Sequence, residues 1–109
     1  MSTARATAGT VGIVLLAASS GCGESPPANP LAERGRQVYL SQCIACHSPD
    51  PAQPGAVGPA VKATTRPLLE TKVLQGTYPS GYAPKRSTRV MPPQPGLAPE
   101  IGALAEYLK

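Results

Sequence analysis

Apolar and polar positions divide the chain into one early apolar run, residues 11–18, and three later segments with helical periodicity. The first of these segments is predicted to begin at Pro30, because Asn29 is a good N-cap and proline is favoured at the first helical position. Its apolar stripe consists of Leu31, Gly35, Val38, Tyr39 and Gln42. A glycine on a buried stripe costs helix propensity, so Gly35 indicates the close approach of another helix.

Two further helices follow from the same spacing. The segment 66–75 is predicted to be helical, with Thr65 or Arg66 as its cap, Pro67 in its first turn and Gly76 at its end. Its apolar side consists of Leu68, Leu69, Val73 and Leu74. The last helix is predicted to open at Pro99, and Lys109 suits its C-terminal dipole. Its stripe consists of Leu97, Ile101, Leu104, Ala105 and Leu108.

Two long stretches between these helices, 48–64 and 77–96, are rich in proline and glycine and show no strand alternation. Loops of this length are unusual in a small domain unless they are functional or disordered, so we expect them to wrap something. The fold class predicted from this pattern is all-α, with three main helices and long irregular loops.

The composition changes the picture, because the chain of 109 residues contains no Phe, no Trp and only four Tyr, but 14 Pro and 11 Gly. A small domain without large aromatic residues is expected to need a disulfide, a metal or a cofactor to stabilise it. The net charge of +4 is weak, and the basic residues are not interleaved with stacking aromatics. These two features argue against nucleic acid as a partner.

The N-terminal residues are typical of an export signal: Arg5 precedes the apolar run, and small residues follow it. The run is shorter than the roughly 20 residues that a membrane-spanning helix needs. Small residues directly before Cys22 resemble the lipobox of bacterial lipoproteins, which implies that Cys22 becomes the lipidated first residue. Two alternatives stay open: an uncleaved N-terminal anchor, and a signal cut elsewhere that leaves a free thiol at Cys22.

This interpretation divides the chain into a lipoprotein-type signal peptide (1–21), a lipidated N-terminus with its linker (22–29) and one domain (30–109). The linker is rich in proline and serine, and its seven residues reach roughly 20 Å when extended. The predicted location is therefore the periplasmic or cell-surface side of a bacterial membrane, with the domain held close to it.

The strongest chemical signal is Cys43-Ile-Ala-Cys46-His47, a C-x-x-C-H sequence, which is the attachment motif for c-type haem. Two thiols at this spacing can each add to a vinyl group on one edge of the porphyrin, and His47, the single histidine of the chain, then lies beneath the iron. The same cysteines could form a thioredoxin-like redox pair, a zinc site or a structural disulfide. A redox pair would need a strand before the motif, and the sequence predicts none there. A zinc site would need a second cluster of ligands, and the sequence contains none.

The candidates for the sixth iron ligand can be reduced by elimination. The chain has two methionines, and Met1 leaves with the signal, so Met91 is the candidate thioether. Ligation by histidine and methionine raises the haem potential, which suits electron transfer. If Met91 does not bind, the candidates are Lys62, Lys72, Lys85, a water or an open position.

Residues 31–109 resemble a small monohaem class I cytochrome c, in the first helix around Gly35, in the complete haem motif, in Gly58-Pro59 and in Met91-Pro92. The resemblance implies a cytochrome c-like fold whose loops wrap one covalent haem c with its iron. It also implies that Cys43 and Cys46 attach the haem, that His47 and Met91 are the axial ligands, and that the Pro59 carbonyl accepts a hydrogen bond from His47.

The expected function is single-electron transfer between membrane-associated redox partners, without enzymatic catalysis. Six cations between Lys62 and Arg89 outnumber the acidic residues there, so we expect a partner with an acidic docking surface. The rival functions are a haem enzyme or gas sensor with an open distal position, and a thiol oxidoreductase without haem.

Overall fold

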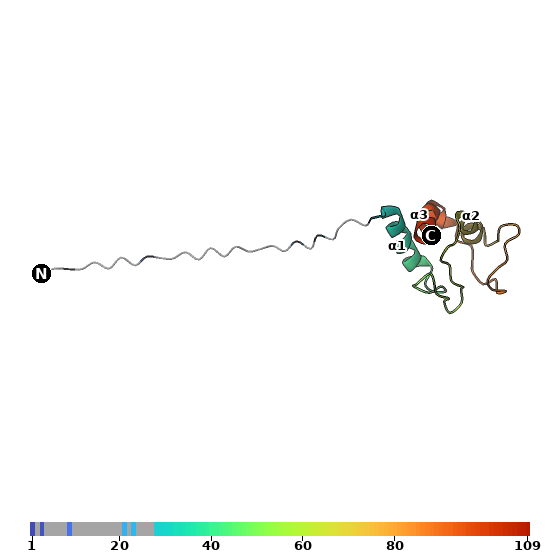
Figure 1. Ribbon diagram of the computed structural model, residues 1–109, viewed down its shortest axis with the longest axis horizontal. Coiled ribbons are helices and arrows are strands. Elements are labelled where there is room, and N and C mark those ends of the chain that lie inside the picture. Colours follow the sequence, from blue (N-terminus) through green and yellow to red (C-terminus); the bar gives the residue numbers. More distant parts are fainter. Residues whose placement is uncertain (2, 4–8, 10–20, 22, 24–27) are drawn as a thin grey trace.

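The structure is a computed structural model that describes residues 28–109 and the isolated residues 1, 3, 9, 21 and 23. Its elements in chain order are α1 (Pro30–Gln42), α2 (Arg66–Leu69), the π-helical turn η1 (Glu70–Leu74), the 3₁₀ helix η2 (Pro95–Glu100) and α3 (Ile101–Tyr107). The described residues contain no strand, and α1, α3 and α2 are joined by long irregular loops, shown in Figure 1. The predicted all-α class is confirmed.

The predicted lipidation site Cys22 and most of the predicted signal peptide and linker lie outside the described residues. Within the part of the chain that the structure describes, no helix is long and apolar enough to cross a membrane.

Helix α1 begins where the sequence predicts, since the Asn29 side chain accepts a hydrogen bond from the Ala32 amide at 3.1 Å. The middle of its stripe is buried, at Gly35, Val38 and Tyr39. The ends of the stripe were predicted wrongly, because Leu31 is 50% exposed and Gln42 is also exposed. Burial follows the crossing with α3: Gly35 lies against Ala103 and Tyr107, so the middle of the stripe is covered.

Gly35 allows the backbones of α1 and α3 to touch. A Cβ atom at this position would lie 2.0 Å from the Ala103 carbonyl oxygen and 2.8 Å from the Tyr107 Cβ atom. The rings of Tyr39 and Tyr107 pack beside the crossing with centroids 5.6 Å apart. The close helix approach predicted from Gly35 is therefore confirmed.

The second helical segment differs from the regular helix predicted for 66–75. It starts as α2 with Thr65 as N-cap, although the Thr65 side chain makes no capping hydrogen bond. It then widens into η1, where the Thr71 hydroxyl donates to the Pro67 carbonyl at 3.0 Å. Threonine hydroxyls that bond the preceding turn distort helices, and single π-helical turns inside helices often mark functional sites.

Gly76 ends the segment with a φ of +73°, as its position after the helix predicts. The last helix begins later than predicted, at Ile101, after the 3₁₀ helix η2. Pro99, predicted to open the helix, lies instead inside η2, so residues 95–100 take the tighter 3₁₀ geometry before the α-helix begins.

Seven buried apolar residues from α1, α2, η1 and α3 and from the residue after α3 form the core. They are Val38, Tyr39, Leu69, Val73, Ile101, Leu104 and Leu108. The core packs at one end against the crossing of α1 and α3. Its other side faces the long loops, and this arrangement positions the site described below.

Replacing Gly35 with alanine should destabilise the protein by about 2–3 kcal/mol, because the new methyl group must displace helix backbone. The matched control is Gly102→Ala on α3, where the nearest atom to an added Cβ is the flexible Arg66 Nη1 at 3.7 Å. That control should be neutral or stabilising by up to about 1 kcal/mol through helix propensity. The measurement is the urea unfolding midpoint of both purified variants, and equal midpoints would contradict the close packing at Gly35.

Candidate functional site

A cavity lies between the core and the long loops. The space inside it is about 1050 Å³, a figure that includes the part open to solvent. Five core residues form its apolar wall: Tyr39, Leu69, Val73, Leu104 and Leu108. Cys43, Cys46, His47 and Met91 line the same cavity, so the structure brings together four side chains that the sequence predicts for one site.

The two cysteines lie where α1 ends and the chain turns. Cys43 is the C-cap of α1, and its amide donates to the Tyr39 carbonyl at 2.9 Å. The amide of His47 donates back to the Cys43 carbonyl at 3.0 Å, which closes a turn over the motif. No disulfide joins Cys43 and Cys46, which are half-buried and exposed respectively. Burial raises the pKa of the Cys43 thiol to about 11, so this thiol is protonated near neutral pH.

The imidazole of His47 is held on two sides by the loop at 55–60. Its Nδ1 lies 2.9 Å from the Pro59 carbonyl oxygen, a contact that the resemblance to cytochrome c implies. A Cβ atom at Gly58 would lie 2.4 Å from His47 Cε1, so only glycine fits against the ring. When Nδ1 donates its proton to the Pro59 carbonyl, Nε2 is the nitrogen with a lone pair for a metal.

Gly55 fixes the same loop to the haem motif, and sequence reasoning missed it. A Cβ atom at Gly55 would lie 2.3 Å from the Cys46 carbonyl oxygen. That carbonyl accepts hydrogen bonds from the amides of Val57 and Gly58, at 3.2 and 2.9 Å. A glycine in a loop is the only sequence signal for this contact, and such a signal does not reveal which segment the glycine touches.

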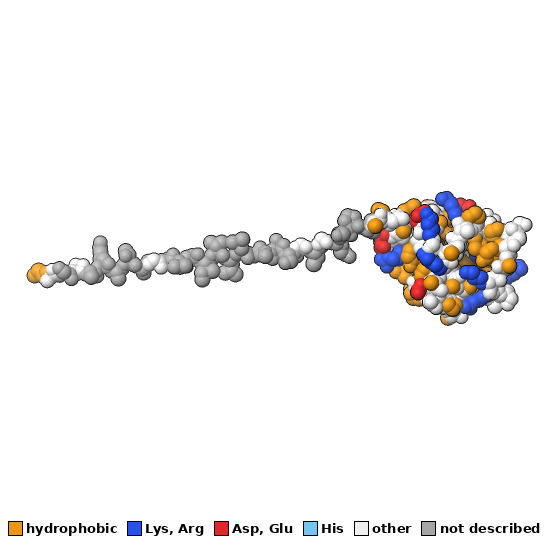
Figure 2. All heavy atoms as spheres, viewed as in Figure 1, with side chains coloured by type: hydrophobic (Ala, Val, Ile, Leu, Met, Phe, Trp, Pro, Cys, Tyr) orange, Lys and Arg blue, Asp and Glu red, His pale blue; other side chains and the backbone are white. Residues whose placement is uncertain are grey.

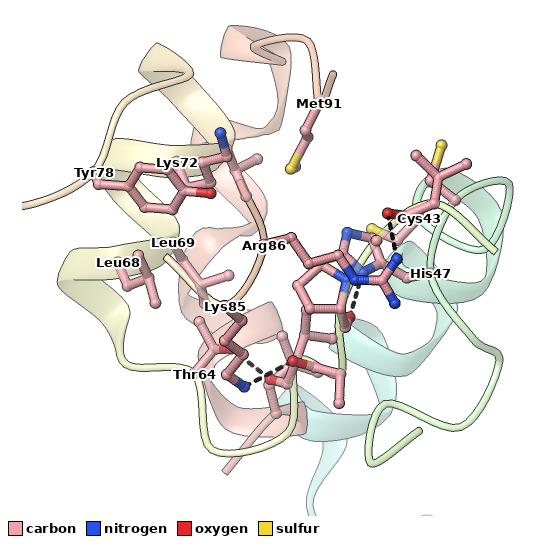
Figure 3. A pocket seen from close by; sticks show the side chains of 18 of the residues that line it. Cys43, His47, Thr64, Leu68, Leu69, Lys72, Tyr78, Lys85, Arg86 and Met91 are labelled. Carbon is pink, nitrogen blue, oxygen red and sulfur yellow. Dashed lines mark hydrogen bonds between the residues drawn. The ribbon is translucent and has the colours of Figure 1, made fainter. Parts of the chain in front are cut away.

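Met91 belongs to the loop 77–94, whose two ends are tied to η1. The Thr77 amide donates to the Thr71 carbonyl at 3.2 Å, and the Gln94 amide donates to the Val73 carbonyl at 2.6 Å. Pro93 packs against Gly76 at the same place. Figure 3 shows the Met91 sulfur pointing into the cavity, with His47 and Cys43 on another wall.

Aromatic and basic side chains complete the cavity wall. The rings of Tyr78 and Tyr82 stack with centroids 5.3 Å apart, and the Lys72 ammonium lies 4.3 Å from the centre of the Tyr78 ring. Tyr39 also lines the cavity, and its hydroxyl donates to the Ser48 carbonyl at 2.6 Å. Burial raises the pKa of Tyr39 to about 12, so its hydroxyl remains a donor across the physiological range.

Two alternatives for the cysteines find no support in the described part of the chain. No group of three or more His, Cys, Asp or Glu residues there could hold a metal ion, which argues against a protein-only zinc site. A thioredoxin-like pair requires a strand before the motif, whereas the residues before Cys43 form α1.

The arrangement fits a c-type haem. Two thiols lie beside one histidine, a thioether comes from another wall, and the remaining surface is largely apolar. The Gly58 position matters most for this fit, because the contact there orients the His47 ring and directs Nε2 away from the Pro59 carbonyl.

Comparison with curated proteins and with solved structures finds no significant match. Residues 30–108 match the family model described as cytochrome C oxidase, cbb3-type, subunit III. This match covers all five helical elements and the whole cavity. The chain therefore belongs to this family and is a cytochrome c domain, with covalently bound c-type haem as its cofactor.

Proposed function

We propose that this cytochrome c domain carries single electrons on a haem that is attached through Cys43 and Cys46 and ligated by His47 and Met91. The observation that supports this proposal best is the His47 ring. It is fixed by the Pro59 carbonyl and by Gly58, in a cavity that the Met91 sulfur also enters. Membership in a cytochrome c family supports electron transport in general, and these contacts support His47 and Met91 as the proposed ligands.

When bound, the haem supplies an iron that gains and loses one electron. The residues of the chain set how this happens. The Pro59 carbonyl fixes the His47 tautomer and makes the ring a better ligand. The Met91 thioether favours the reduced state of the metal and so raises the potential. If His47 and Met91 both hold the iron, no coordination position would stay open for a substrate, and we infer on this ground that the protein carries electrons and is not an enzyme.

Export and anchoring are part of the same proposal. The apolar run at 11–18 and Cys22 support a lipoprotein signal, cleavage before Cys22 and a lipid anchor at that residue. The proposed location is the periplasmic or cell-surface side of a bacterial membrane. The short linker keeps the domain within reach of redox partners in that membrane.

The charge distribution supports a partner with an acidic docking surface. Four glutamates of the described residues pair with cations: Arg34–Glu100, Arg36–Glu33, Arg66–Glu70 and Lys109–Glu106. Within the same residues, the cations outside these pairs are Lys62, Lys72, Lys85, Arg86 and Arg89, and three of them line the cavity. Figure 2 shows Lys and Arg side chains spread over one face, with the acidic side chains mainly toward the α1 side.

The ligand is tested by Met91→Leu, which keeps the side-chain volume and removes the sulfur. The potential should fall by on the order of 0.1 V or more, since axial ligands set much of the haem potential. The reduced protein should also bind carbon monoxide at least about tenfold faster, because leucine leaves the iron accessible. Redox titration and stopped-flow mixing measure the two effects, and unchanged values for both would exclude Met91 as the ligand.

The anchor is tested by Cys22→Ser, with Ser20→Ala as the control that leaves the cysteine in place. The wild type and the control should fractionate with membranes and be released by detergent. The Cys22→Ser protein should not carry the lipid, because serine has no thiol to modify. Mass spectrometry of the N-terminus measures the modification, and a wild-type protein without lipid would contradict the anchor.

Docking is tested by the rate of electron transfer to an acidic partner protein as a function of salt. Steering between opposite charges weakens when salt shortens the screening length to about 8 Å at 0.15 M, so the rate should fall as salt rises. Lys62→Glu should lower the rate at low salt, whereas Lys109→Glu, which is outside the cationic segment, should change it little. A rate that is constant or rises with salt would contradict the acidic-partner proposal.

A further inference from the structure

We infer that the side chains of Lys85 and Arg86 join the loop 77–94, which carries Met91, to the loop 55–60, which holds the His47 ring. We call this pair of side chains the strap, and we infer that it positions both proposed iron ligands. The inference rests on the proposed ligation by these two residues. The sequence assigns Lys85 and Arg86 only to a group of surface cations. Their contacts in the structure indicate a more specific role, because both side chains line the cavity and end on backbone carbonyl groups.

Three hydrogen bonds make up the strap. The Lys85 ammonium donates to the Ala60 carbonyl at 2.8 Å. The Arg86 guanidinium donates through Nη1 to the Val57 carbonyl at 2.9 Å and through Nη2 to the Gly55 carbonyl at 3.4 Å. Figure 3 shows Lys85 and Arg86 at the cavity, with dashed lines for the hydrogen bonds between the residues drawn.

The three acceptors bracket the segment that holds the His47 ring. Gly55 and Val57 precede Gly58-Pro59 in the chain, and Ala60 follows directly. The same segment donates from Val57 and Gly58 to the Cys46 carbonyl within the haem motif. A continuous path of hydrogen bonds therefore runs from the Met91 loop through Arg86 and Val57 to the residue next to His47.

The strap also connects the middle of the Met91 loop to the opposite wall of the cavity. The ends of the loop, at Thr77 and Gln94, are joined by hydrogen bonds to η1. Between these ends, Lys85 and Arg86 provide the side-chain hydrogen bonds that connect the Met91 loop to the loop 55–60 in the described part of the chain. Without them, the two walls of the cavity could separate and the distance between the ligands would be less well fixed.

The geometry at Arg86 requires more than positive charge. A guanidinium presents several N–H groups in a planar fork, so one side chain can reach two carbonyls that are two residues apart. A lysine ammonium is a compact point charge and would reach one of them. None of the ion pairs among the described residues includes Lys85 or Arg86, so the carbonyl oxygens are their polar partners in this structure.

The test compares Arg86→Gln, Arg86→Lys and the control Arg89→Gln in the haem-loaded protein. Arg89 lies in the same loop, and its side chain forms no hydrogen bond or ion pair within the described part of the chain. The control therefore removes the same charge as Arg86→Gln without breaking the strap. Two readouts are used: the rate of carbon monoxide binding to the reduced protein, and hydrogen exchange of the Val57 and Gly58 amides by NMR. The Leu108 amide, which bonds to the Leu104 carbonyl in the core, serves as the internal reference.

Arg86→Gln should raise both the carbon monoxide rate and the exchange rates of Val57 and Gly58 by roughly tenfold, because two ordinary hydrogen bonds are lost. Exchange at Leu108 should stay within about twofold, which separates a local opening from a general loss of stability. Arg86→Lys should restore the wild-type rates only in part, and Arg89→Gln should have the same rates as the wild type. Lys85→Gln removes one hydrogen bond of the strap and should raise both rates by about threefold. If Arg86→Gln does not fold, Lys85→Gln takes its place in the test.

The inference is overturned if Arg86→Gln matches the wild type in both readouts, if Arg86→Lys restores both completely, or if Arg89→Gln has the same effect as Arg86→Gln. Failure of the strap and failure of the proposed ligation remain distinguishable. Amide exchange at Val57 and Gly58 reports the strap directly, whereas the Met91→Leu measurement reports the ligand.

Discussion

The apolar core of this domain is also one wall of its haem cavity, and the rest of the structure depends on this sharing. Tyr39, Leu69, Val73, Leu104 and Leu108 belong to both. A chain without Phe or Trp has few large side chains with which to build a separate core. The backbone contact of Gly35 with Ala103 brings α1 and α3 together behind this wall. Folding and cofactor binding are therefore expected to stabilise one another.

The functional geometry is produced mainly by backbone groups that act on a few side chains. The Pro59 carbonyl and the bare Cα of Gly58 hold His47, and the Cys46 carbonyl holds the loop that carries them. On the other wall, η1 anchors both ends of the loop that carries Met91. Such contacts leave little freedom at His47 and Met91, the proposed ligands, which suits a site whose two redox states should differ little in structure.

Much of this could be predicted from sequence, because the determining signals are local. The Asn29–Pro30 start, the burial of Gly35 and the end at Gly76 follow from capping rules and helical spacing. One motif predicts Cys43, Cys46 and His47 as site residues, and the structure places all three on one cavity. The π-helical turn, the late start of α3 and the exposure of Leu31 were not predicted. They depend on the Thr71 hydroxyl, which bonds to the preceding turn, on the 3₁₀ geometry of residues 95–100, and on the place where α3 crosses α1, at Gly35. The contacts of Gly55 and Arg86 join segments distant in the chain, and no local pattern reports such pairs.

The central claim is that one haem is bound covalently through Cys43 and Cys46, and peptide mass spectrometry of the purified protein tests it most directly. Cleavage after Arg36 and Lys62 releases one peptide, 37–62, that contains both cysteines and His47. The account predicts that this peptide carries the mass of one haem and that neither cysteine reacts with a thiol-alkylating reagent. A peptide of unmodified mass with two alkylated cysteines, from protein produced in cells that attach c-type haem, would contradict it.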